Sequence, residues 1–171
     1  MSGRAPALRA FDGLYRLGLA VAFRLLKVWW RLTHPTIEGV YVAVRCGDEL
    51  LMIRNSYRRA YSLPSGRRGR NEDPAAAAVR ELHEEVGIET PAEALRLVAE
   101  VRHRERLVDD HVHFFELRLD VAPEIRIDHR EVVWAGFEPL ARARERAVLP
   151  IVRRYLEGTL DEISVRPAAE P

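Results

Sequence analysis

The most constraining feature of the sequence is a segment with start and stop signals for a helix, at residues 73–87. Asp73 can cap the free amide groups of a first turn, and Pro74 suits the first helical position. Gly87 can end the helix in left-handed geometry, so the predicted helix runs from about Pro74 to Val86. Apolar residues recur at helical spacing and form one stripe, made of Ala75, Ala78, Val79, Leu82 and Val86. We expect this stripe to pack against a core.

The opposite face of the predicted helix carries three carboxylates, Glu81, Glu84 and Glu85. Like charges at three- and four-residue spacing cost an isolated helix roughly a few tenths of a kcal/mol per pair, and within the helix only Arg80 is close enough to relieve them. A divalent cation would remove the repulsion, and hard oxygen ligands suit Mg²⁺ or Mn²⁺. Such an ion supports hydrolysis of phosphate compounds. A solvated acidic face without a metal is the alternative interpretation.

Extended segments flank this helix on both sides and predict an α/β fold. The chain has 171 residues and 47% hydrophobic content, which suits one well-buried domain. A turn at 46–49 joins the first two β-rich runs into a hairpin, and Pro64 and Gly66 mark a loop before the helix. The predicted strands are 36–45, 50–53, 95–101, 113–119 and 131–139, and a last helix is predicted at 149–158.

The strongly charged stretch 102–110 is predicted to be a hairpin end or a loop near the substrate. A group of potential metal ligands lies in and beside it, namely His103, Asp109, Asp110, His111 and His113. These residues lack a regular ligand spacing, so we interpret them as part of a polar loop and not as a second metal site.

The amino-terminal segment, residues 7–33, is predicted to be an amphipathic helix. Five cations and Asp12 fall in one sector roughly 120° wide, and apolar residues cover the rest of the circumference. The cations interrupt the segment too often for a transmembrane span. Two interpretations remain, peripheral contact with a membrane interface or packing of the apolar face on the main domain or a second subunit. We therefore divide the chain into an extension at 1–34, a main domain at 35–160 and a tail at 161–171.

Charge and cysteine content limit the partners and the compartment. With 27 basic and 26 acidic residues the net charge is +1, so no overall field favours a nucleic-acid partner. Cys46 is the single cysteine and cannot form an intramolecular disulfide, which suits a reducing cytoplasm. If the amino-terminal helix binds lipid, the chain would lie at the inner face of the membrane.

The region from Gly66 to Ile88 resembles the signature of the Nudix hydrolase family. All nine fixed positions of the Nudix box are matched, by Gly66, Glu72, Arg80, Glu81, Leu82, Glu84, Glu85, Gly87 and Ile88. The resemblance implies a Nudix-type α/β/α sandwich with a central mixed sheet, here preceded by the amphipathic helix. It also implies a pyrophosphohydrolase that uses Mg²⁺, or Mn²⁺, to cleave a diphosphate linkage in a nucleoside diphosphate joined to another group, X.

The same resemblance implies roles for individual residues. Metal would be bound by the carboxylates of Glu81, Glu84 and Glu85 and by the carbonyl of Gly66. Arg80 would hold the glutamates in position. The catalytic residues would then be Arg80, Glu81, Glu84 and Glu85. Glu81 and a downstream carboxylate such as Glu116 are both candidates for the general base. Glu72 would support the junction between loop and helix.

Residues outside the defining positions of the box are expected to select the substrate, a small nucleotide-derived diphosphate. Arg54, Tyr57 and Arg67 are the candidate substrate-binding residues, with a merely solvated loop as the alternative. Ser65 and Asn71 stand where the family often has glycine, and Asn tolerates a positive φ better than Ser does. The alternative function is a non-catalytic nucleotide-binding or membrane-associated module, and a homodimer is also left open.

Overall fold

The computed structural model describes residues 18, 21–22, 25, 36–105 and 108–160, without the side chains of 36–37, 102–105 and 108–110. The amino-terminal segment 7–33 therefore lies almost entirely outside the described residues, as does the tail 161–171. Within the part of the chain that the structure describes, no helix is long and apolar enough to cross a membrane. Membrane contact, homodimerisation, the cellular location and the three-part division of the chain stay predictions.

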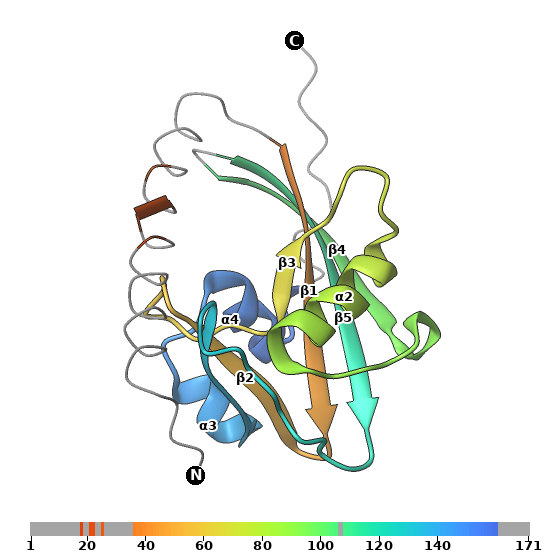
Figure 1. The fold of residues 1–171 in the computed structure, drawn as a ribbon, viewed down its shortest axis with the longest axis vertical. Helices are drawn as coiled ribbons and strands as arrows, with labels where there is room; N and C mark the ends of the chain where they lie inside the picture. Colours follow the sequence, from red (N-terminus) through yellow and green to blue (C-terminus); the bar gives the residue numbers. More distant parts are fainter. Residues whose placement is uncertain (1–17, 19–20, 23–24, 26–35, 106–107, 161–171) are drawn as a thin grey trace.

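A six-stranded mixed sheet forms the centre of the domain (Figure 1). The strands are β1 (Thr36–Cys46), β2 (Glu49–Asn55), β3 (Ser65–Arg67), β4 (Arg96–Glu105), β5 (Val108–Leu119) and β6 (Val132–Pro139). Their order is β4-β5-β1-β2-β6, with β3 paired to β1. β1 and β5 run parallel to each other, whereas every other pairing is antiparallel. β1 is therefore the strand around which the sheet is organised.

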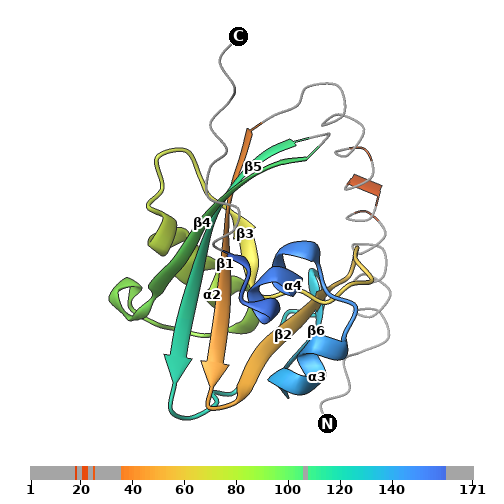
Figure 2. The ribbon, with the colours of Figure 1, turned by 180° about the vertical axis from the view of Figure 1, so that it is seen from behind.

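Helices cover both faces of this sheet. Helix α2 (Pro74–Val86) lies on one face, and α3 (Leu140–Glu145) and α4 (Pro150–Glu157) lie on the other, as the opposite views in Figure 1 and Figure 2 show. A short 3₁₀ turn, η1 (Ala92–Ala94), leads from α2 to β4. Each face has its own buried core, one built around Leu82 and Val86 of α2 and the other around Val152 and Leu156 of α4. The predicted α/β/α sandwich is confirmed.

The predicted signals of α2 act as expected. The Asp73 carboxylate accepts hydrogen bonds from the amides of Ala75 at 2.9 Å and Ala76 at 3.1 Å. Gly87 has a φ of 71°, the left-handed geometry that ends the helix. Leu82 and Val86 of the apolar stripe are fully buried against the sheet. Local signals thus define this helix at both ends.

The structure differs from the sequence interpretation at β3 and at His111, and it contains helix α3, which was not predicted. Residues 65–67 form β3 and pair with β1, opposing Gly66 to Val40, where the sequence predicts only a loop. Residues 102–105 and 108–110 belong to β4 and β5, which pair as far as Glu105 and Val108, in agreement with the predicted hairpin end. His111 lies on β5 ahead of the predicted strand 113–119, so its assignment to a polar loop was wrong. Pairing with a distant strand decided the conformation of residues 65–67, and the register of β4 with β5 decided that of His111.

Candidate functional site

The carboxylate of Glu81 lies in close contact with a glycine. A Cβ atom on Gly66 would fall 2.0 Å from both Cδ and Oε1 of Glu81, far inside van der Waals contact. Strand β3 is held beside α2 by its pairing with β1, so this close approach is built into the fold. Glycine is therefore required at position 66 for Glu81 to occupy its place. The structure brings the backbone of Gly66 and this glutamate together, as expected from the sequence.

Glu85 is almost entirely buried on the same side of α2, with 6% of its surface exposed. Its carboxylate accepts a hydrogen bond from the Ser65 amide at 2.8 Å and one from the Asn55 side chain at 3.4 Å. Burial, together with the charges of Glu81 and Glu131, raises the pKa of Glu85 to about 8. Burial also raises the pKa of Glu81, although hydrogen bonding from Arg80 lowers it. A bound cation would stabilise the charged form of both carboxylates.

The high pKa of Glu85 predicts how the stability of the metal-free protein depends on pH. The folded carboxyl keeps its proton up to about pH 8, while the unfolded one loses it near 4.5. The folded state therefore binds the extra proton, and the free energy of unfolding should fall as pH rises, by at most about 1.4 kcal/mol per pH unit. Urea unfolding in EDTA at several pH values between these limits measures the slope. Glu85→Gln should flatten it, and equal slopes in both proteins would contradict the assignment.

Arg80 ties the acidic residues to the loop that precedes the helix. Its guanidinium donates to Glu72 Oε1 at 3.0 Å, to Glu81 Oε1 at 2.7 Å and to the Arg67 carbonyl at 3.0 Å. The exposed Glu84 carboxylate lies 3.6 Å from it, one helical turn away. Hydrogen bonds from Arg80 also lower the pKa of Glu72. Arg80 is thus placed to hold Glu81 in position, and Glu72 to anchor Arg80.

The loop between β3 and α2 closes around Glu72. The Glu72 carboxylate accepts a hydrogen bond from the Gly69 amide at 2.6 Å, and Arg68 donates to the Glu72 carbonyl at 3.0 Å. Asn71 has a φ of 63°, the left-handed conformation that its side chain was expected to tolerate. This geometry explains how asparagine can stand at a position where glycine is frequent.

Sequence reasoning did not assign a role to Glu131, which the structure places beside the acidic residues of α2. Glu131 precedes β6, and its carboxylate accepts a hydrogen bond from the Tyr57 hydroxyl at 3.0 Å. Its charge contributes to the raised pKa of both Glu81 and Glu85. In the sequence, Glu131 is only an acidic residue at the start of the predicted strand 131–139. Only the pairing of β6 with β2, which carries Asn55 opposite Val132, shows that it belongs here.

Glu116 does not join this group. It lies on β5 with its side chain toward α4, and hydrogen bonds from Arg96, Arg118 and Tyr155 hold it there at 2.7–2.9 Å. Although burial alone would raise its pKa, these donors lower the pKa of Glu116 to about 2. Its candidacy as general base was wrong, because alternation along the strand directs it to the face opposite α2.

Two of the three predicted substrate-binding residues lie near the glutamates of α2, and the third does not. Tyr57 is half-buried and donates a hydrogen bond to Glu131, so the structure places it near the glutamates of α2. Arg67 contributes its carbonyl to Arg80 and exposes its side chain beside Gly66. The Arg54 guanidinium lies 5.9 Å from the centre of the Tyr61 ring. Because Tyr61 packs into the core on the side of α3 and α4, Arg54 is not gathered with the glutamates.

The donor set fits a hard divalent cation. Glu81, Glu84 and Glu85 are successive or nearby residues of α2, with Glu81 against the backbone of Gly66 and Glu85 bound to the Ser65 amide, and burial raises the pKa of Glu81 and Glu85. The hydrogen bonds and ion pairs described above for these glutamates involve no histidine or cysteine within the described part of the chain. Carboxylate and carbonyl oxygens are the ligands that Mg²⁺ and Mn²⁺ prefer.

Comparison with known proteins shows the family of this chain. The model of the NUDIX domain matches residues 35–156, so the chain belongs to the Nudix family. No relative was found among curated protein sequences. The family match confirms the resemblance drawn from the box, and the predicted enzyme class, a pyrophosphohydrolase, follows at the level of the family.

Solved structures show the same fold. The MutT protein of Methanosarcina mazei Go1 is 20% identical, with a TM-score of 0.61 over 73% of this chain and 93% of its own. An Ap4A hydrolase of C. elegans is 20% identical, with a TM-score of 0.59 over 71% of this chain and 93% of its own. The bifunctional NMN adenylyltransferase/ADP ribose pyrophosphatase of Francisella tularensis is 19% identical, with a TM-score of 0.63 over 87% of this chain and 48% of its own.

Proposed function

We propose that this chain is a Mg²⁺-dependent pyrophosphohydrolase that cleaves the diphosphate linkage of a nucleoside diphosphate joined to another group, X. The observation that carries the proposal is the contact of the Glu81 carboxylate with the backbone of Gly66, with Glu85 one helical turn further along α2 and the pKa of both carboxylates raised by burial. The names of structural neighbours point to the same chemical class, since they include Ap4A and ADP ribose. Mn²⁺ has the same ligand preference and is the alternative ion.

Glu81, Glu84, Glu85 and the Gly66 carbonyl are the proposed metal ligands. A bound divalent ion neutralises charge on phosphate oxygens and lowers the pKa of water. Arg80 keeps Glu81 directed toward Gly66 through the 2.7 Å hydrogen bond, and Glu72 keeps Arg80 in place. Arg80 is in this sense a positioning residue with respect to the carboxylates, and its charge also favours an anionic substrate.

Hydrolysis requires a group that takes a proton from water as its oxygen attacks phosphorus. The new P–O bond replaces the bond to the bridging oxygen, which leaves with the second phosphate. Glu81 and Glu131 are the two candidates for this base, because both lie close enough to Glu85 to raise its pKa, whereas Glu116 is bound to Arg96. The Tyr57 hydroxyl donates to one oxygen of Glu131 and so fixes the direction of its carboxylate. We assign Tyr57 and Arg67 to the substrate and keep Arg54 as a more distant contact.

A screen of the purified full chain tests this function. The panel should include ADP-ribose, nucleotide sugars, dinucleoside polyphosphates and nucleoside triphosphates, each with Mg²⁺, with Mn²⁺ and with EDTA. We expect release of a nucleoside monophosphate from at least one compound, in the presence of metal and not in EDTA. Mass spectrometry of the products in ¹⁸O-water identifies the attacked phosphorus. Absence of turnover across the panel with both metals would contradict the proposal.

A further inference from the structure

Three potential metal ligands come together on β4 and β5, away from the acidic residues of α2. His111 and His113 are two residues apart on β5 and so point to the same face of the sheet. Glu100 of β4 lies directly opposite His113 in the pairing register. Phe115, which follows on the same face, packs in the core beneath α2. The cluster therefore lies on the face of the sheet that α2 covers.

The ligand atoms of these side chains are close enough to share one ion. One ligand atom from each of the three residues lies within 4.8 Å of the others. His111 Nε2 is 3.5 Å from one Glu100 oxygen, and His113 Nε2 is 3.9 Å from the other. The two imidazole rings are tilted by 46° with their centres 4.7 Å apart. Small side-chain rotations would bring these atoms to the separations found around a single bound cation.

The histidines also have polar atoms that the protein does not satisfy. His113 is 8% exposed, and its Nδ1 atom is buried without a hydrogen-bond partner among the described residues. The buried Nε2 atom of His111 likewise makes no hydrogen bond within that part of the chain. Buried polar atoms in native proteins are normally bonded, so the unsatisfied His111 Nε2, 3.5 Å from Glu100, lacks a partner that a bound ion would supply.

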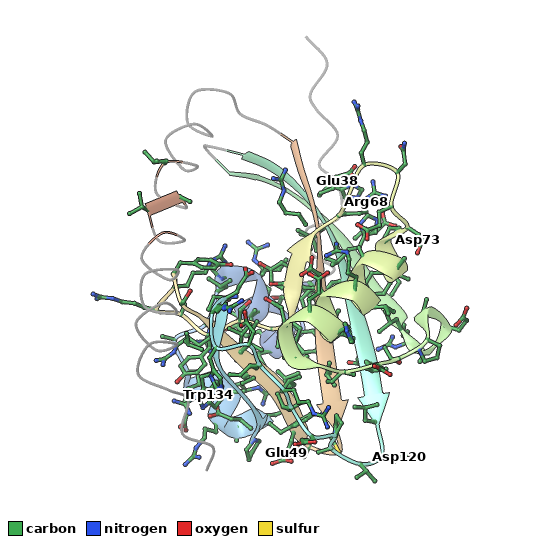
Figure 3. The ribbon with its side chains drawn as sticks, in the orientation of Figure 1. Glu38, Glu49, Arg68, Asp73, Asp120 and Trp134 are labelled. Atoms are coloured by element: carbon green, nitrogen blue, oxygen red, sulfur yellow. The ribbon has the colours of Figure 1, made fainter. Side chains whose placement is uncertain are left out.

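The surroundings of the cluster favour a neutral ring at His113. Burial and the neighbouring His111 lower the pKa of His113, and a neutral imidazole is the form that donates a lone pair to a metal. Arg68, on the neighbouring loop, also lowers the pKa of His113, and it is bound to Glu38 at 2.8 Å. Figure 3 shows this pair together near the start of α2. Glu38 thus neutralises Arg68 and leaves the Glu100 carboxylate to the histidines.

We infer that Glu100, His111 and His113 form a second metal site, which takes a divalent transition-metal ion such as Zn²⁺. Two imidazoles and one carboxylate are a known ligand set for zinc and for ferrous iron, with coordination positions left open. Mg²⁺ prefers oxygen ligands and would stay with the glutamates of α2. The register separates the two sites, since Gly66 and His113 both pair with Val40 from opposite sides. Two strand spacings correspond to roughly 10 Å.

Metal titration of the full chain tests this site without any measurement of hydrolysis. Zn²⁺ is titrated by calorimetry in a large excess of Mg²⁺, which occupies the oxygen-only site. We expect one Zn²⁺ to bind per chain under these conditions. Co²⁺ should give visible absorption bands characteristic of nitrogen ligands, and Zn²⁺ should displace it. Failure of the wild-type chain to bind Zn²⁺ in excess Mg²⁺ would overturn the inference.

Variants then locate the bound ion. Glu100→Gln and His111→Gln should each weaken Zn²⁺ binding by at least roughly 10- to 100-fold, the loss seen when even a supporting partner of a metal ligand is removed. Glu100 is half exposed, so its replacement tests the site without disturbing the core. His83→Gln changes an exposed histidine on α2 and is the matched control. Glu84→Gln should keep Zn²⁺ binding whatever its effect on hydrolysis. Unchanged Zn²⁺ affinity in both test variants would overturn the assignment.

Discussion

Glu84→Gln is expected to reduce metal-dependent hydrolysis by roughly 100- to 1000-fold, the usual cost of removing one preorganised charge-stabilising group. The substitution removes one charged oxygen ligand and keeps the shape of the side chain. Glu84 is 57% exposed and lies 3.6 Å from Arg80, so its structural contribution is small. We expect the free energy of unfolding to change by less than about 0.5 kcal/mol. Steady-state kinetics in Mg²⁺ and urea unfolding measure the two effects.

The matched control is Glu93→Gln, which removes the same charge from the exposed η1 turn and should leave turnover unchanged. The same comparison of wild type with Glu84→Gln distinguishes an enzyme from a binding module. If these two proteins bound nucleotide equally and neither released a phosphate product, the non-catalytic function would be the correct one. Loss of turnover in the variant with retained folding supports the hydrolase.

Gly66→Ala is expected to lower kcat/KM by about 100-fold or more, because the added methyl group takes the place of a carboxylate. The new Cβ would lie 2.0 Å from Oε1 of Glu81, so Glu81 must leave its position. A displacement of about 1 Å in a catalytic group can cost roughly 100-fold in rate. The hydrogen bond from Arg80 to Glu81 would be disturbed at the same time. Kinetics as a function of Mg²⁺ concentration should show weaker activation by Mg²⁺ as well as a lower kcat.

A double-mutant cycle separates this local cause from a general loss of structure. If Gly66→Ala acts by displacing Glu81, its combination with Glu81→Gln should be no worse than Glu81→Gln alone. Gly136→Ala is the control, since its Cβ would lie 3.3 Å from a Trp134 side-chain atom on β6. Fully additive losses in the cycle would show that the substitution at position 66 acts by another route.

Helix α2 could be predicted in detail because its ends depend on local contacts. Capping by Asp73 and termination at Gly87 involve residues at most a few positions away, and both follow directly from residue type. The left-handed conformation at Asn71 is local in the same way. The hard oxygen donors on one helix face follow from helical periodicity, so the proposed metal ligands were also visible before the fold was known.

Contacts between residues on different strands could not be predicted from local sequence in this way. β3 has three residues and little sequence signal, and its extended conformation depends on pairing with β1. Strand alternation directs Glu116, a predicted candidate for the general base, toward α4. The pairing of β6 instead brings Glu131, to which no role was assigned, close to the glutamates of α2. Glu100 is separated from the two histidines by a hairpin, and only their register unites them.

By itself, the sequence determined helix α2, its caps, its acidic face and the family to which the chain belongs. These features depend on residue type at short, fixed spacing, where backbone geometry leaves few alternatives. The tertiary structure alone decided which distant carboxylate approaches Glu81, why position 66 must lack a side chain, and that two histidines meet Glu100. Each of these depends on strand pairing between residues far apart in the chain, which local periodicity does not encode.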